Sequence, residues 1–182
     1  MIAIGECGLD FSRGKSPELR ARQVAAFRGH AELARETGLP LSIHCVKAHG
    51  VLLELLREQP LPPSAMHAYS GSAELAGQLA KLGHYISFAA NVCIPNARRV
   101  LAAARAVPEA RLLIETDSPD QTPPGRRPAP NEPAFIVDVA ARLAELREQS
   151  IKAIAALTLA NAYRLFPRAR PFAETQLDPP PR

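Results

Sequence analysis

The chain has 182 residues, and its 22 basic side chains against 18 acidic ones give it a formal charge of +4. A content of 47% hydrophobic and 22% charged residues is typical of a globular protein that can bury a full core. No apolar run approaches the length of a membrane span, and the mild positive charge permits a polyanionic partner without requiring one.

Short apolar runs predict five β-strands, at residues 1–6, 39–44, 64–67, 84–88 and 111–116. Longer segments rich in Ala, Leu, Arg and Glu predict helices at residues 16–38, 47–59, 72–83, 96–107, 131–148 and 150–166. Strands that alternate with helices in this way predict a parallel sheet. The pattern alone leaves two architectures open, an open doubly wound sheet and a (β/α) barrel.

The elements predict a single domain over residues 1–167, followed by a loose Pro-rich tail over residues 168–182. The chain has neither a G-x-G-x-x-G fingerprint nor a P-loop, so nothing in it indicates a nucleotide-binding site. Three cysteines without a CxxC spacing argue for reduced thiols in a cytoplasmic protein.

Polar side chains fall where four of the predicted strands end. Glu6, His44 and His67 close the first three strands, and Asp117 closes the fifth. The carboxyl ends of parallel strands open on one face, so these four side chains are expected to converge there. Carboxylates and imidazoles together suit Zn²⁺, Mn²⁺ or a similar divalent ion.

Each of these residues also has a simpler interpretation. A single histidine at a strand end is more often a hydrogen-bonded structural residue. Asp117, which precedes Ser118 and Pro119, could be the N-cap of a following helix. Four such coincidences on one face are less plausible than a shared metal site, so the pattern favours the metal site.

A long Pro-rich loop over residues 123–133 follows the fifth strand on the same face. Its arginines, Arg126 and Arg127, are either contacts for a phosphate group or ordinary solvated loop charges, and the sequence favours neither.

At these positions the sequence resembles the TatD family of metal-dependent deoxyribonucleases. The motifs that carry the resemblance follow the family's order along nearly the whole chain up to Pro167: "IGECGLDF" (4–11), "PLSIH" (40–44), "HAYSGS" (67–72), "YISF" (85–88), "LLIETDSP" (112–119), "RPAPNEP" (127–133) and "NAYRLF" (161–166).

The resemblance implies a TIM (β/α)8-type barrel that cleaves DNA phosphodiester bonds with two divalent ions, such as Mg²⁺, Mn²⁺ or Zn²⁺. By the family's pattern Glu6 would bridge the two metals, and His44 and His67 would ligate one of them. Asp117 would ligate the other metal and handle the proton of the attacking water. The substrate-side loop would contain Arg126, Arg127 and Asn131.

The sequence also departs from the family pattern. It contains no H-x-H strand, the element that opens the family's barrel, so only one metal is expected if the missing ligands are not supplied. About six of the eight βα units are present, and roughly 70–100 residues of a barrel of about 250 are absent. After the strand-end His44 the family tends to carry an arginine; here Val46 stands at that position, with Lys47 next to it as the remaining candidate for a phosphate contact.

We expect this departure to reflect a start assigned too far downstream or a shortened sequence. The alternatives are a short variant completed by oligomerisation and a degenerate, non-catalytic copy. An incomplete barrel would expose unpaired sheet edges, and these predict self-association.

The leading hypothesis is a metal-dependent deoxyribonuclease in which Glu6 and Asp117 are catalytic. A hydrolase of the same superfamily that acts on amides, esters or lactones is the second. The third is a catalytically impaired remnant that at most binds nucleic acid.

Overall fold

The computed structural model of the protein describes residues 1–170, which contain five β-strands and six α-helices, as predicted. The strands are β1 (Ile4–Asp10), β2 (Leu41–Val46), β3 (Ala65–Met66), β4 (Tyr85–Phe88) and β5 (Leu112–Ile114). The helices are α1 (Pro17–Thr37), α2 (His49–Glu58), α3 (Ala73–Lys81), α4 (Arg98–Ala106), α5 (Ile136–Leu146) and α6 (Ile151–Leu165).

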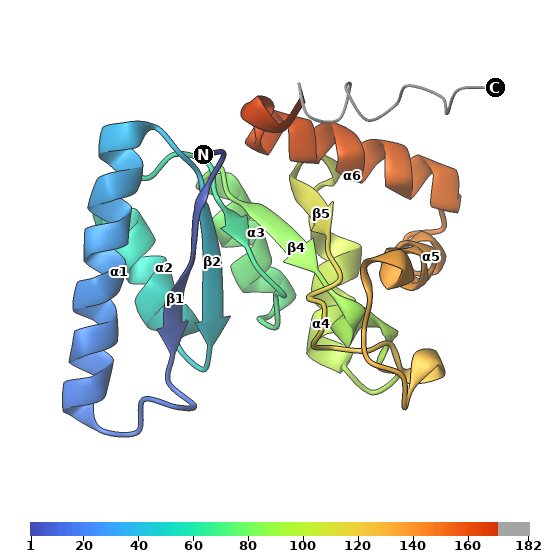
Figure 1. Ribbon diagram of the computed structural model, residues 1–182, viewed down its shortest axis with the longest axis horizontal. Helices are drawn as coiled ribbons and strands as arrows, with labels where there is room; N and C mark the ends of the chain where they lie inside the picture. The colour runs from blue at the N-terminus through green and yellow to red at the C-terminus, as the bar shows by residue number, and fades with distance from the viewer. Residues whose placement is uncertain (171–182) are drawn as a thin grey trace.

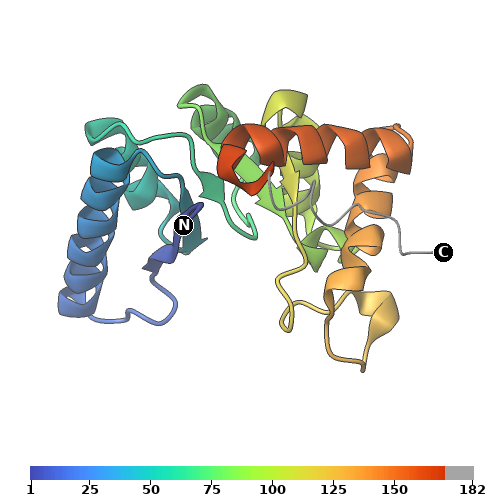
Figure 2. The same cartoon turned by 45° about the horizontal axis from the view of Figure 1, so that its top comes forward.

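All five strands lie in one parallel sheet, in the order β1-β2-β3-β4-β5. A doubly wound sheet reverses its strand order at the middle, and this sheet does not, so the barrel alternative is correct. Within residues 1–170, β1 pairs with β2 alone and β5 with β4 alone, which leaves the sheet unclosed. Figures 1 and 2 accordingly show α1 and α6 at opposite ends of the molecule. The fold is an incomplete TIM-type barrel.

The helix boundaries follow from local capping chemistry. Ser16, Ser72 and Ser150 are the N-caps of α1, α3 and α6, and each side chain accepts a hydrogen bond from a backbone N–H three residues later. Helix α1 ends at Gly38, whose φ of +66° is a left-handed conformation that glycine adopts without strain. The sixth predicted βα unit is represented by a helix only, because α6 follows α5 without a strand between them.

Strand β1 is longer than predicted, because it continues past Glu6 to Asp10. Its register against β2 shifts between Ile4 and Cys7, which indicates a bulge beside Glu6. Gly8 has a φ of +146°, and a Cβ atom at this position would collide with the carbonyl group of His44. Only glycine therefore allows β1 to pair so closely with β2.

The two faces of the sheet have different partners. Met66, Ile86 and Leu112, on β3, β4 and β5, belong to the main hydrophobic core. Their neighbours in sequence point to the opposite face, where Ala65, Tyr85 and Leu113 form a second apolar cluster with Leu165 of α6. This second face is the inner face of the incomplete barrel, and the end of α6 covers the part of it that carries Ala65, Tyr85 and Leu113.

The described residues include only the first three residues of the predicted tail, 168–170. Pro167–Ala169 form a short 3₁₀ turn after α6, while residues 171–182 lie outside the described residues. The predicted boundary between a domain at 1–167 and a tail at 168–182 stays a prediction. Over residues 1–170, no helix is both long enough and apolar enough to cross a bilayer.

Candidate metal centre

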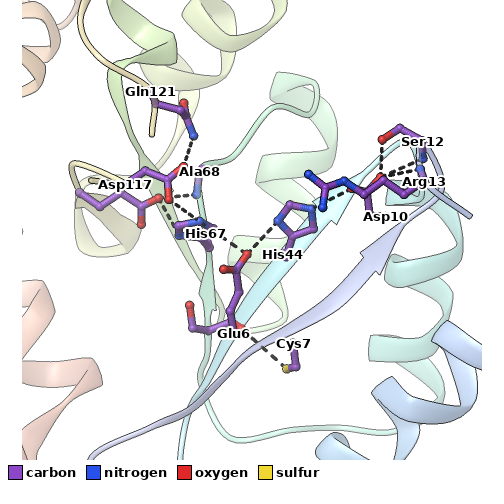
Figure 3. A network of polar contacts seen from close by, with 12 residues as sticks. Glu6, Cys7, Asp10, Ser12, Arg13, His44, His67, Ala68, Asp117 and Gln121 are labelled. Atoms are coloured by element: carbon purple, nitrogen blue, oxygen red, sulfur yellow. Dashed lines mark hydrogen bonds and ion pairs between the residues drawn. The ribbon is translucent and has the colours of Figure 1, made fainter. Parts of the chain in front are cut away.

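The four predicted metal ligands come from four places along the sheet. His44 lies near the end of β2, His67 directly follows β3, and Asp117 lies shortly after β5. The prediction that Glu6 ends the first strand was wrong, because Glu6 lies within β1 at the bulge. A bulge can still aim a side chain at the rim of a barrel, and Glu6 points toward the two histidines (Figure 3).

These four side chains meet in one chain of polar contacts, with Glu6 between the two histidines (Figure 3). The Glu6 Oε1 atom lies 2.9 Å from Nδ1 of His44 and 3.7 Å from Nε2 of His67. The same Nε2 atom of His67 lies 3.1 Å from Oδ1 of Asp117. The structure therefore brings the four predicted residues together through pairwise polar contacts.

The chemistry of this donor set fits a divalent cation, since it combines carboxylate oxygens with imidazole nitrogens. An ion with bonds of about 2.1 Å holds neighbouring ligand atoms roughly 3.0–3.4 Å apart, and two of the three separations found here, 2.9 and 3.1 Å, are close to this range. Within residues 1–170, however, no three His, Cys, Asp or Glu side chains already converge as a bound ion requires. The donors contact one another instead, as the distances between Glu6, His44, His67 and Asp117 show.

Asp10 belongs to the same cluster and was missed by the sequence analysis. Its Oδ2 atom lies 3.7 Å from Nε2 of His44, and its Oδ1 atom accepts a hydrogen bond of 2.9 Å from the backbone N–H of Ser12. Burial tends to raise the pKa of Asp10, but hydrogen bonds from Ser12 and Arg13 outweigh it and hold this pKa below its usual value. The rule that strand-end carboxylates reach the rim would have found Asp10 if the first strand had been extended to it.

Glu115 was also missed, although it stands in the same motif as Asp117. Its Oε1 atom lies 2.8 Å from Nδ1 of His67. This hydrogen bond, together with the negative charges of Glu115, Asp117 and Glu6, raises the pKa of His67 to about 9 against the opposing effect of burial. The signal in the sequence was the two-residue period that places Glu115 on the same face as Leu113.

A cavity of about 490 Å³ opens at the cluster. Its lining includes Glu6, Asp10, Arg13, His44, His67 and Asp117. A smaller cavity of about 240 Å³ shares His44, His67 and Asp117 with the first one and extends toward Asn91. The cluster therefore faces enough open space to receive a substrate group as well as an ion.

Four carboxylates line the larger cavity, and Arg13 and two histidines are the basic side chains of its lining. The side chain of Arg13 is 90% exposed and lies 3.6 Å from Asp10, so it is free to reach into the cavity from its rim. The prediction from the family pattern did not include this arginine, although it lies only three residues beyond Asp10 in the chain.

The predicted substrate-side residues lie elsewhere, since none of them lines the two cavities at the cluster. Arg126 forms a two-pronged ion pair with Asp138, at 2.8 and 3.1 Å, and its guanidinium group lies over the ring of Phe135. Arg127 donates to the carbonyl group of Thr122 at 3.3 Å.

The other two predicted substrate-side residues occupy structurally restricted positions. The side chain of Asn131 is buried, and its amide donates to the carbonyl group of Thr116 at 2.6 Å, which fixes the loop that carries Asp117. Lys47 follows β2 with a φ of +54°. Asp117 has a φ of +60°, so two of the segments that leave the strands at the rim carry the backbone strain found at many functional sites.

Comparison with known proteins gives several matches over most of the chain. The sequence profile described as TatD related DNase matches residues 1–167. The uncharacterized metal-dependent hydrolase YabD of Bacillus subtilis is 39% identical, over 91% of this chain and 65% of the relative. The 3'-5' ssDNA/RNA exonuclease TatD of Edwardsiella piscicida is 35% identical, over 91% of this chain and 66% of the relative.

The fold has a match among solved structures as well. The crystal structure of YjjV, a TatD homologue from Escherichia coli, superposes with a TM-score of 0.84 at 32% identity, over 91% of this chain and 63% of that one. The chain thus spans slightly less than two thirds of the length of the proteins that it matches.

Proposed function

This chain belongs to the TatD related DNase family, and we propose that it is a divalent-metal-dependent hydrolase that cleaves phosphodiester bonds in DNA. The observation that carries the proposal is the convergence of Glu6, His44, His67 and Asp117 beside an open cavity. Relatives named as metal-dependent hydrolases and as ssDNA/RNA exonucleases support it.

In this proposal Glu6, His44, His67 and Asp117 hold Mg²⁺, Mn²⁺ or Zn²⁺. A bound divalent ion lowers the pKa of its water and offsets negative charge on the phosphate group. The family resemblance implies two ions, and Glu6 would then be the carboxylate shared between them. Because the sequence contains no H-x-H strand, we propose one ion for this chain.

The protein side chains have separate tasks around this centre. Asp117 is placed to accept a proton from an attacking water, because it lines the cavity. Arg13 supplies the positive charge that a phosphodiester needs in a cavity lined by carboxylates. Lys47, Arg126, Arg127 and Asn131 remain predicted substrate-side residues in the surrounding loops.

We also propose that the protein self-associates through the open edges of its sheet. Strands β1 and β5 each have one edge without a partner among residues 1–170, and such edges tend to pair with other chains. Light scattering after gel filtration tests this, and a monomer at high concentration would contradict it.

The free cysteines Cys7, Cys45 and Cys93 support a reducing, cytoplasmic location.

The proposed activity is tested with labelled single-stranded DNA in the presence of Mn²⁺ or Mg²⁺. Wild-type protein is expected to shorten the DNA, and Glu6→Ala is expected to abolish this cleavage. Glu145→Gln is the matched control, because Glu145 is an exposed carboxylate paired with Arg142 outside the cluster. Cleavage that survives Glu6→Ala would reject the proposed site.

Two other functions follow from particular observations. Several relatives are named only as metal-dependent hydrolases, so the bond cleaved could be an amide, ester or lactone. A panel of nitrophenyl esters and phosphodiesters distinguishes these substrates. The other candidate is a catalytically impaired protein, because the sequence contains no H-x-H strand. DNA binding that weakens with salt, without turnover, would favour that candidate.

A further inference from the structure

Both carboxylate oxygens of Glu115 have close partners at the rim of the sheet. Its Oε1 atom accepts a hydrogen bond from the backbone N–H of Ala68 at 2.6 Å and lies 2.8 Å from Nδ1 of His67. Its Oε2 atom accepts a hydrogen bond from the hydroxyl group of Ser87 at 2.6 Å. One side chain after β5 is thus joined to β4 and to the segment that follows β3.

These contacts determine how His67 is presented to the cavity. An imidazole has two nitrogen atoms, and a hydrogen bond at one of them decides which atom is left for a ligand. Because Nδ1 of His67 is held by Glu115, its Nε2 atom is the one that faces Glu6 and Asp117. If the imidazole ring were turned by 180°, a carbon atom would face Glu6 and Asp117 instead.

Ser87 holds Glu115 in turn. Its side chain is 3% exposed on β4, where it has no access to bulk water to compete for its hydroxyl group. The side chain of Glu115 is itself only 22% exposed, whereas that of Glu6 is 50% exposed. The two glutamates therefore differ: Glu6 faces the open cavity, and Glu115 lies behind His67 in a set of fixed partners.

We propose that Glu115 is a positioning residue that holds His67 with Nε2 toward the metal site, and that Ser87 locks Glu115 in this role. The proposal rests on the proposed function only for the identity of the ligand that Nε2 receives. The competing interpretation is that Glu115 merely ties down the backbone at Ala68, where φ is +42°.

The first test uses nuclear magnetic resonance on the metal-free protein with labelled histidine. The wild type is expected to show an exchange-protected ring N–H proton of His67, identified by its absence in His67→Gln. In Glu115→Gln this resonance should shift upfield or disappear, because a hydrogen bond to a charged acceptor is stronger than one to an amide. A wild type without the resonance, or a variant that keeps it unchanged, would overturn the proposal.

The second test measures the affinity for Mn²⁺ alone by calorimetry. Removal of a partner behind a metal-binding histidine typically weakens metal affinity by about 10–100-fold, which is the change expected for Glu115→Gln. Ser87→Ala should weaken it in the same direction by a smaller factor. Since glutamine still offers an acceptor to the Ala68 N–H, a merely structural role predicts unchanged affinity in Glu115→Gln.

Two controls keep the outcomes separate. Glu145→Gln should bind Mn²⁺ like the wild type, and circular dichroism shows whether each variant is folded. If Glu115→Gln does not fold, the milder Ser87→Ala decides, and unchanged affinity in that variant would contradict the proposal. If the wild type itself binds no Mn²⁺, the proposed function fails, while the resonance of His67 still tests the role of Glu115.

Discussion

The inner face of β3, β4 and β5 carries two layers of side chains with opposite characters. The lower layer consists of Ala65, Tyr85 and Leu113, which pack against Leu165 of α6. Each residue of the upper layer lies two positions after a residue of the lower layer, either on the strand or in the loop that follows it. The upper layer consists of His67, Ser87 and Glu115, which are joined by hydrogen bonds. A single two-residue step thus separates the part of the face that stabilises the fold from the part that could perform chemistry.

The difference lies in what covers each layer. The lower layer is sealed by the end of α6, and burial of each large apolar side chain there contributes roughly 1.5–3 kcal/mol to the free energy of unfolding. The upper layer adjoins an open cavity, and its polar groups are tolerated because they have partners. The two layers should therefore respond differently to substitution.

The largest expected effect is on activity, at the rim. Asp117→Asn removes the proposed proton acceptor but keeps the shape of the side chain. Since a general base contributes about 10²–10⁴-fold to a rate, kcat for DNA cleavage should fall by roughly 10³-fold. Urea unfolding should show a free energy of unfolding close to that of the wild type. A large loss of stability, with kcat preserved in the folded fraction, would contradict the catalytic role of Asp117 beside the upper layer.

Next in size is a change of stability in the lower layer. Leu113→Ala should lower the free energy of unfolding by about 2–5 kcal/mol, because it leaves a cavity beside Tyr85 and Leu165. At urea concentrations below its unfolding midpoint, the variant should still bind Mn²⁺ with nearly wild-type affinity. Unchanged stability would mean that α6 does not seal this layer.

A third prediction concerns pH and His84, which is buried at the base of the sheet just before β4. Burial, with a smaller contribution from Arg111, lowers the pKa of His84 to about 4. The unfolded chain takes up this proton near its ordinary pKa of about 6.5, so stability is full above that pH and declines as the pH falls from 6.5 toward 4. The decline due to this group should approach about 3 kcal/mol.

Urea titrations of the wild type and His84→Asn at several pH values measure this contribution. The difference between the two proteins should shrink as the pH falls from about 6.5 to about 4, because the variant lacks the group that titrates. A difference that is constant over this range would show that His84 is not held neutral by the fold.

The smallest expected effect is a difference in KM between variants of Arg13 and Arg126, which belong to neither layer. Arg13→Gln should raise KM for DNA about tenfold, because among residues 1–170 Arg13 is the one arginine that lines the larger cavity. Arg126→Gln should change KM by less than about threefold, because this arginine is already paired with Asp138. Steady-state kinetics at one salt concentration compares them, and the reverse order would favour the family-based prediction for Arg126.

The sequence predicted the number and order of the elements because helix caps such as Ser16 and apolar strands leave local signals. It also predicted that His44, His67 and Asp117 would converge, since parallel strands place their ends on one face. It misplaced Glu6 because a bulge at Gly5 and Glu6 leaves no signal in the hydrophobic pattern. With β1 taken to end at Glu6, Asp10 was overlooked.

The partners of His67 were harder to predict for a different reason. The two-residue period places Glu115 on the same face as Leu113, but its contact with His67 depends on the register of β3, β4 and β5, which no local pattern contains. The pairing of Arg126 with Asp138 is likewise a contact between a loop and α5. Motifs indicate which residue types gather at the rim, but only the packed chain shows which side chains already have partners.

The most direct test of the metal centre is anomalous X-ray scattering from crystals of the protein grown with Mn²⁺. The account predicts an anomalous peak within bonding distance of side-chain atoms of Glu6, His44, His67 and Asp117. A peak ligated by other residues, or none at a saturating Mn²⁺ concentration, would contradict it.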